Sequence, residues 1–256
     1  MDIDQVTTYI GQVELETPEG SLLLSDEELP RLEDATQQAA VVDSNLVTFP
    51  EGTPLRVKNA VGSWLILAQR GASAKVSDKN DTKGWVSAYH DVLLQTGWVR
   101  RGDAEAWVEE EVAGSTVHQK ILAVVAVVLG PAPAALAIVT AALQSLQQMN
   151  EDSPWITLFD RRGRSATSVG FQVANCVASA DAGAALHSID FRVDAKQVLT
   201  QVLFFKFTKS EATMFRRGVI LELTPAALAA FGPAVQERVK TATLDSIAAI
   251  DLVDPA

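Results

Sequence analysis

An uncharged apolar stretch at residues 121–143, ILAVVAVVLGPAPAALAIVTAAL, constrains this chain more than any other feature. It reaches the length of about 20 residues that a transmembrane helix needs. However, Gly130-Pro131-Ala132-Pro133 lies in its middle, where proline removes backbone donors and breaks a helix. Each half is then too short to cross a bilayer as a helix. We therefore predict a pair of apolar helices that is buried on a sheet in the soluble form, and an ordinary buried helical hairpin is the plainer interpretation.

The hydrophobic pattern after this stretch has a period of two, which is typical of β-strands. Phe171 lies on the apolar face of one such segment, and Phe191 lies on that of another. On the second segment Asp190, Arg192 and Asp194 take the opposite face. Short connections favour antiparallel neighbours. The predicted strands cover residues 155–160, 167–175, 187–195, 198–207 and 213–223.

The N-terminal third predicts a mixture of strands and helices. Residues 12–17 are typical of a short strand. Ser25 stands three residues before Glu28, as in a capping box, and this spacing indicates a helix over residues 25–42. Residues 54–69 are rich in Val, Leu and Ile and favour a strand, although their length leaves a helix open.

The next two segments predict a helix and a hairpin. Residues 84–97 are typical of an amphipathic helix, because Trp85, Tyr89 and Leu93 stand about one helical turn apart. Residues 97–112 indicate two short strands around a turn at the Arg-Gly-Asp sequence in their centre.

This order of elements predicts a single α/β domain over residues 1–256, in which helices cover a largely antiparallel sheet. Thr224-Pro225 starts a helix near the C-terminal end, and Gly232-Pro233 separates it from a second one. The expected parts are a peripheral N-terminal segment, the apolar helix pair, the antiparallel strand block and the C-terminal helices, at residues 1–40, 115–149, 154–223 and 224–256.

The net charge of −11 argues against a nucleic-acid backbone or a strongly anionic bilayer as the main partner, whereas neutral lipid head groups are compatible with it. Cys176 is the only cysteine, so no internal disulfide exists, which fits a bacterial cytoplasm. The start of the chain, MDIDQVTTYIGQVELE, lacks the basic and apolar regions of a secretory signal. We therefore expect synthesis in the cytoplasm without a signal peptide, followed by release or by delivery to target membranes.

Several short motifs follow one another in the second half of the chain. They are Val128-Leu129-Gly130, Ala142-Leu143-Gln144-Ser145-Leu146, the set Asn150, Glu151, Trp155 and Ile156, the set Val169, Phe171 and Asn175, then Phe191-Arg192-Val193-Asp194 and Gln201-Val202-Leu203-Phe204-Phe205. In this order and spacing they resemble the cytolytic delta-endotoxins, the Cyt family. The resemblance covers residues 90–225 and is most specific over 121–223, whereas residues 1–80 match poorly.

This resemblance implies a three-layer α/β fold with the sheet sandwiched between helical hairpins. It also implies membrane action, in which the helices peel away and the strands meet or enter lipid. Strands of about nine to eleven residues reach roughly 30 Å, which is also what a tilted transmembrane strand requires. We therefore expect a pore-forming or membrane-permeabilising toxin or virulence factor that binds membrane lipid, and self-association is left open. The residues expected to enter the membrane are Val128, Leu136, Leu203, Phe205 and Phe207.

The mushroom volvatoxin and the Evf-type virulence factor are similar in fold to this group, and the Evf-type protein is known for a fatty-acylated cysteine. This similarity implies an alternative function, in which the protein binds or transfers a fatty acyl chain that Cys176 carries as a thioester. Phe171, Phe191 and Phe205 would contact that chain. The plain alternative is a small buried Cys176, which is the usual role of a free cysteine. Apart from such an acyl chain we expect no cofactor.

One constellation could support catalysis, with Cys176 as nucleophile, His187 as base and Asp181 or Asp190 as the orienting group. It would make the protein an acyl transferase or a thioesterase. The motifs of serine hydrolases, P-loop proteins and Rossmann proteins are absent, and the histidines lack metal-ligand spacing, so we expect no metal site. A third hypothesis is a Cyt-fold protein that binds a partner protein without lytic action.

Overall fold

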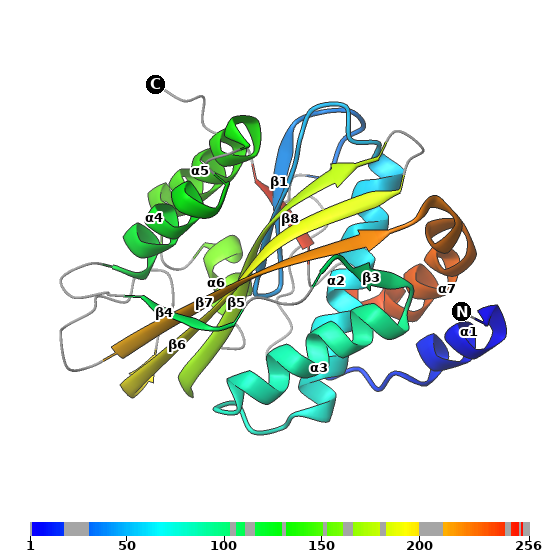
Figure 1. Ribbon diagram of the computed structural model, residues 1–256, viewed down its shortest axis with the longest axis horizontal. Coiled ribbons are helices and arrows are strands. Elements are labelled where there is room, and N and C mark those ends of the chain that lie inside the picture. The colour runs from blue at the N-terminus through cyan, green and yellow to red at the C-terminus, as the bar shows by residue number, and fades with distance from the viewer. Residues whose placement is uncertain are drawn as a thin grey trace.

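Eight strands in the described part of the chain form one mixed sheet, in the order β3-β7-β6-β5-β2-β1-β8, with β4 also paired to β7 (Figure 1). The computed structural model describes residues 2–17, 31–102, 106–110, 116–129, 132–150, 153–160, 166–179, 183–199, 212–243, 247–250 and 252. The strands are β1 (Gln38–Val42), β2 (Asn45–Phe49), β3 (Trp98–Arg100), β4 (Val108–Glu110), β5 (Ala166–Ala178), β6 (Ala184–Leu199), β7 (Ala212–Leu223) and β8 (Ile247–Ile250).

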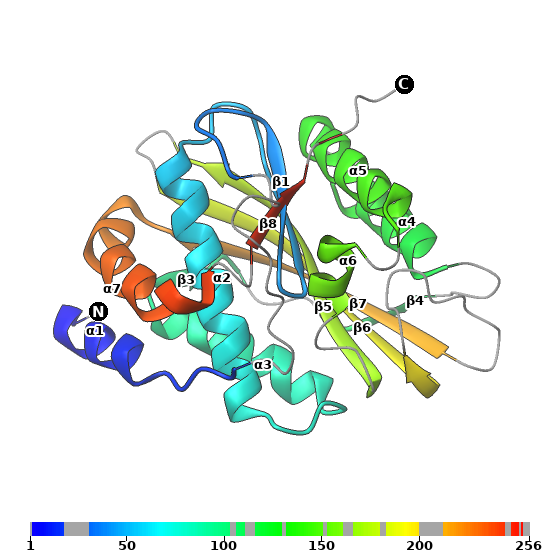
Figure 2. The same ribbon diagram turned by 180° about the vertical axis from the view of Figure 1, so that it is seen from behind.

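Helices cover both faces of this sheet, and Figure 2 shows the arrangement from behind. On one face lie α1 (Ile3–Gln12), α2 (Leu55–Lys75), α3 (Thr82–Gln95) and α7 (Pro225–Thr243). On the other face lie α4 (Val117–Leu129), α5 (Pro133–Gln148) and α6 (Pro154–Asp160). Each helical layer shares a separate apolar core with the sheet. The predicted three-layer α/β architecture is therefore confirmed.

Strand alternation divides β5 and β6 between these two cores, because successive side chains point to opposite faces. Phe171 of β5 and Phe191 of β6 are register partners whose rings stack 5.1 Å apart, and both lie in the core beneath α4 and α5. Cys176 and its register partner Leu186 lie in the other core, which they share with α2 and α7. The predicted period of two is confirmed for both strands.

The pairing of the strands is antiparallel in the long central part, as predicted, but not throughout. β5, β6 and β7 are antiparallel neighbours, whereas β5 also pairs with β2 in parallel register. β1 and β2 form a tight hairpin in which Asp43 adopts a positive φ of 45°. The parallel pairing joins segments that are more than a hundred residues apart, so no local sequence pattern indicates it.

The prediction of a strand over residues 54–69 is wrong, because Leu55–Lys75 forms the helix α2. This helix lies against β1, α3 and α7, so apolar residues occur on all its sides and the helical period is hidden. Trp64 shows how deeply α2 is placed, since its side chain is fully buried and its Nε1 donates to Thr96 Oγ1 at 3.1 Å.

Three other segments also differ from their predicted type. Residues 13–17 form no strand, and the segment predicted as a helix over 25–42 contributes β1 instead, while residues 25–30 lie outside the described part. Residues 155–160 belong to the helix α6 rather than to a strand. This helix begins at Pro154, at the position where a missing backbone N–H costs little.

The C-terminal part of the chain and the predicted hairpin also differ from their predicted structures. α7 continues through Gly232-Pro233 as one helix, because Phe231, Val235 and Val239 are buried along its length against the rest of the core. Ile247–Ile250, predicted as helical, forms the strand β8 next to β1. The two short strands of the predicted hairpin exist as β3 and β4, but both pair with β7.

Replacing Phe171 with Ala is expected to lower the free energy of unfolding by about 3–5 kcal/mol, because the ring is fully buried and its removal leaves a cavity. Urea unfolding followed by tryptophan fluorescence measures the change. Val198→Ala is the control, since Val198 is 53% exposed and should change stability by less than about 0.5 kcal/mol. Equal effects of the two substitutions would contradict the assignment of Phe171 to a packed core.

Candidate functional site

The helix pair α4–α5 presents an uncharged surface to solvent. Lys120 is the only Asp, Glu, Lys or Arg in these two helices. Val127 is 73% exposed, the most of any large apolar residue in the described part of the chain, and Val128 and Leu136, two of the residues expected to enter the membrane, are half-buried. The other exposed members of the surface are Ala123, Ala126, Pro133, Ala134 and Ala137.

The structure thus has the predicted pair of short apolar helices, although Gly130 and Pro131 between them lie outside the described residues. Among the helices of the described residues, none is both long enough and apolar enough to cross a membrane. Leu203, Phe205 and Phe207, the remaining residues expected to enter the membrane, also lie outside the described part of the chain.

The inner side of the pair covers an apolar face of the sheet. Ile121 and Val125 of α4 and Val139 and Leu143 of α5 are buried in this core. α5 packs on β1, β2 and β5. The strand residues of this core are Ala39, Val41, Leu46, Val169, Phe171, Val173, Ile189, Phe191, Val193, Leu199, Met214 and Ile250. The sheet therefore has one continuous apolar face, which the helix pair shields from water.

His118 is a buried titratable group within the helix pair. Its Nε2 lies 2.7 Å from the carbonyl oxygen of Leu143, so it joins α4 to α5. Burial lowers the pKa of His118, and its hydrogen bond to Leu143 acts in the opposite direction. The folded state therefore favours neutral His118, and this contribution to stability is lost as the pH falls below the ordinary histidine pKa of about 6.5.

The opposite face of the sheet carries a row of polar side chains across four adjacent strands. Asn45 of β2 is the register partner of Gln172 in β5, Gln172 is that of Asp190 in β6, and Asp190 is that of Arg217 in β7. We call these four residues the polar row. Asn45, Gln172 and Asp190 are fully buried, and the Arg217 side chain is 16% exposed.

The helix α3 covers the polar row and bonds to it directly. His90 Nε2 lies 2.7 Å from Asp190 Oδ2, and Arg217 Nε donates to the same oxygen at 2.8 Å. Tyr89 of α3 accepts a hydrogen bond from Asn45 Nδ2 at 3.4 Å. A buried carboxylate is thus held between two basic groups, one from the helix and one from the sheet.

Two opposing effects set the ionisation of Asp190. Burial acts to raise the pKa of Asp190, but the charges and hydrogen bonds of His90 and Arg217 outweigh it and leave the pKa below its ordinary value. Asp190 is therefore ionised at neutral pH. This cluster stabilises the fold above the ordinary aspartate pKa of about 4, and that contribution is lost as the pH falls through the lowered pKa.

Asp190→Asn is expected to lower the free energy of unfolding at neutral pH by about 3–5 kcal/mol, because two buried basic groups lose their carboxylate. The variant should also lose less stability than the unchanged protein when the pH falls below about 4. Urea unfolding over a pH series measures both effects. Lys196→Gln is the control on the same strand, since Lys196 is exposed and its substitution should change stability by less than about 0.5 kcal/mol.

Cys176 and His187 do not form a catalytic pair in this structure. Cys176 is opposite Leu186 in the register, whereas His187 is opposite Asn175, so the two side chains point to opposite faces of the sheet. His187 is exposed, while Cys176 is fully buried. Asp190 bonds to His90 rather than to His187, and Asp181 lies outside the described residues.

Cys176 also lies apart from the phenylalanines expected to contact an acyl chain. Phe171 and Phe191 belong to the core beneath α4 and α5, and Cys176 belongs to the core on the other face. Phe205 lies outside the described part of the chain. Burial raises the pKa of the Cys176 thiol to about 12, so the reactive thiolate is scarce at neutral pH. Acylation of Cys176 stays a prediction, which intact mass before and after hydroxylamine tests.

The Cys176 thiol is expected to resist alkylation by iodoacetamide at pH 8 in the native protein, because it is fully buried and remains protonated. In guanidinium chloride the same thiol should react completely. Mass spectrometry of the intact protein follows the added carbamidomethyl group. Rapid labelling of the native protein would show that the core around β5 opens readily.

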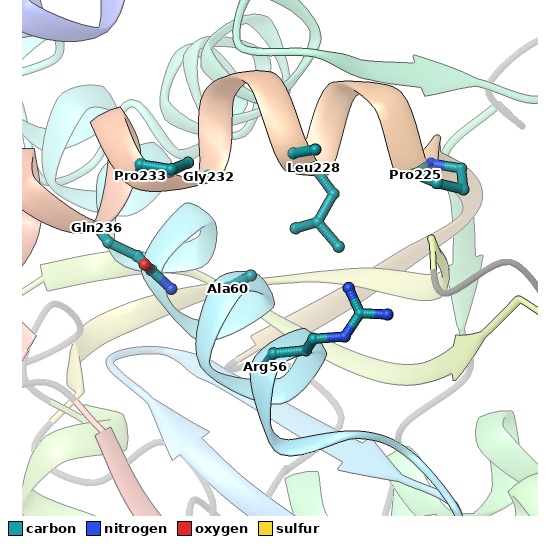
Figure 3. Close-up of a pocket in the computed structure, with 8 residues that line it drawn as sticks. Arg56, Ala60, Pro225, Leu228, Gly232, Pro233 and Gln236 are labelled. Carbon is teal, nitrogen blue, oxygen red and sulfur yellow. The ribbon is translucent and has the colours of Figure 1, made fainter.

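A shallow groove of about 210 Å³ lies between α2 and α7 (Figure 3). Ala60, Leu228 and Gly232 contribute to its apolar lining, and Arg56 and Gln236 extend beside it from the two helices. This volume is below the roughly 300–1,000 Å³ of ordinary small-molecule sites. Neither polar side chain is a general base near neutral pH, so the groove offers no acid–base pair for catalysis.

The polar row was not found from the sequence. Alternation indicated that Asp190, Arg192 and Asp194 share a face, but it did not show that this face is covered by α3. The partners of Asp190 come from α3 and β7, which lie 100 and 27 residues away along the chain. The one local signal of a polar contact between helix and sheet was His90, which lies in the amphipathic helix predicted over residues 84–97.

No family model matches this sequence, and no curated protein matches it. Among solved structures, a delta-endotoxin is similar with a TM-score of 0.40 and 13% identity, over 84% of this chain and 96% of that chain. The structure of the Evf virulence factor is similar with a TM-score of 0.30 and 11% identity, over 96% of this chain and 89% of that chain. The likeness is one of fold.

Proposed function

We propose that this protein binds lipid bilayers through the α4–α5 pair and permeabilises them after the pair leaves the sheet. The observation that carries this proposal is the uncharged outer surface of the pair, which includes the exposed Val127, above an apolar sheet face. Contiguous exposed apolar surface on a protein marks a site of contact with a membrane or a partner. A toxin or virulence factor that acts on membranes is the function that fits it best.

When α4 and α5 leave the sheet, they exchange contacts with the sheet for contacts with lipid, and hydrocarbon favours this exchange. α4 and α5 contact the sheet mainly through aliphatic side chains such as Ile121, Val125 and Val139. Lipid tails are as apolar as these side chains, so hydrocarbon can replace the lost core contacts. A full charge at the centre of a membrane helix costs about 2.5–3.5 kcal/mol, and the segment after Lys120 carries none through the end of α5.

The charge of the protein supports a preference for neutral lipid. The formal net charge is −11, and an anionic bilayer surface repels such a protein over a distance set by the ionic strength. Binding to phosphatidylcholine vesicles should therefore exceed binding to phosphatidylserine vesicles at low salt. The acidic surface thus favours attachment by apolar contact rather than by charge.

Val127→Glu is expected to reduce vesicle binding and dye leakage by about tenfold, because it places a charge on the apolar surface. Leakage from phosphatidylcholine vesicles and co-flotation with them measure the two effects. Val99→Glu is the control, since Val99 is 54% exposed but lies on β3, away from the helix pair. Absence of leakage with micromolar unchanged protein, with and without protease trimming, would rule out the proposal.

A further inference from the structure

The helix pair α4–α5 contacts the sheet through an apolar core and through one ion pair. The one full charge in the pair, Lys120, lies 3.2 Å from Glu110 of β4. The buried hydrogen bond of His118 goes to Leu143 of α5, so it stays within the pair when the two helices move together. The core cluster beneath the pair is made of apolar side chains.

The helix α3 is attached to the opposite face by polar contacts at both ends. Near its start, Thr82 Oγ1 lies 2.7 Å from Ser168 Oγ of β5, and this hydroxyl bonds to Asp194 of β6 at 2.6 Å. Further along, Tyr89 bonds to Asn45 and His90 bonds to Asp190. These bonds connect one helix to three different strands.

Removal of α3 would uncover a surface that lipid does not accept. The polar row would lose His90, and the carboxylate of Asp190 would keep Arg217 as its remaining partner. Arg192 and Asp194 lie on the same face of β6. Ionisable groups are costly in hydrocarbon, whereas the apolar face under α4 and α5 contains none of these charged residues.

We propose that the polar row, together with His90 and Tyr89, is a latch that keeps α3 on the sheet while α4–α5 leaves it. Membrane binding then exposes one face of the sheet only, the apolar one. This inference rests on the proposed function, and it names the part of the molecule that stays closed. The polar face remains covered by α3 throughout the encounter with lipid.

A disulfide between α3 and β5 tests the latch directly. The hydroxyl oxygens of Thr82 and Ser168 are 2.7 Å apart, which places their Cβ atoms in a range where two cysteines can bridge. The protein with Thr82→Cys and Ser168→Cys, in a Cys176→Ala background, is compared before and after reduction by dithiothreitol. Dye leakage from phosphatidylcholine vesicles is the readout, and Cys176→Ala alone is the reference.

The oxidised and reduced forms are expected to cause leakage at rates that agree within about twofold, because α3 does not move. Leakage that appears only after reduction would overturn the latch while leaving the proposed function intact. Absence of leakage from the reference protein would instead remove the proposed function. The two failures are therefore distinct.

Hydrogen exchange of the unmodified protein gives a second measurement that needs no cross-link. On addition of phosphatidylcholine vesicles, exchange in α4 and α5 should change by about tenfold or more, whereas exchange over Thr82–Gln95 should stay within about twofold. In Asp190→Asn, exchange of α3 in the bound state should rise by about tenfold, and in Lys196→Gln, at an exposed position of β6, it should not. Equal loss of protection in α3 and α4–α5 of the unmodified protein would overturn the latch.

Discussion

Side-chain alternation along β5 and β6 sends aromatic and aliphatic residues to one face of the sheet and polar residues to the other. The stacked pair Phe171 and Phe191 occupies the first face, and the register pair Gln172 and Asp190 occupies the second. Because the two strands pair over most of their length, neither can shift by one residue without inverting both faces. The placement of every covering helix follows from this division.

The carboxylate of Asp190 is fully buried, so its desolvation is costly. Its desolvation is offset because His90 and Arg217 both contact Oδ2, and loss of one partner of such a group costs about 3–5 kcal/mol. A well-packed apolar cluster of the same size would often be as stable or more so. The cluster instead gives a directional contact, which defines how α3 lies across β6 and β7.

The two helical layers therefore differ in what can replace them. If α4 and α5 left the sheet in water, the apolar face of the sheet would be exposed to water, which is unfavourable. In a bilayer, hydrocarbon chains can cover the same face. α3 also packs on an apolar core, but in addition it covers buried polar groups that water solvates and hydrocarbon does not. One sheet thus combines an apolar face with a face that has to stay covered or wet, and α4–α5 is the layer whose release the proposed membrane binding requires.

Local pattern determined a large part of this molecule. The period of two identified the faces of β5, β6 and β7, and the uncharged stretch around Gly130-Pro131 indicated two short helices. Tertiary structure decided the rest, because it depends on contacts between distant segments. α2 is a helix although its apolar residues hide the period, since other elements bury several of its sides. The parallel pairing of β2 with β5 completes the polar row, and only this register brings Asn45 beside Gln172. Burial of Cys176 on the face opposite His187 was likewise decided by the sheet, because residues 176 and 187 belong to different strands and the register sets which side chains meet.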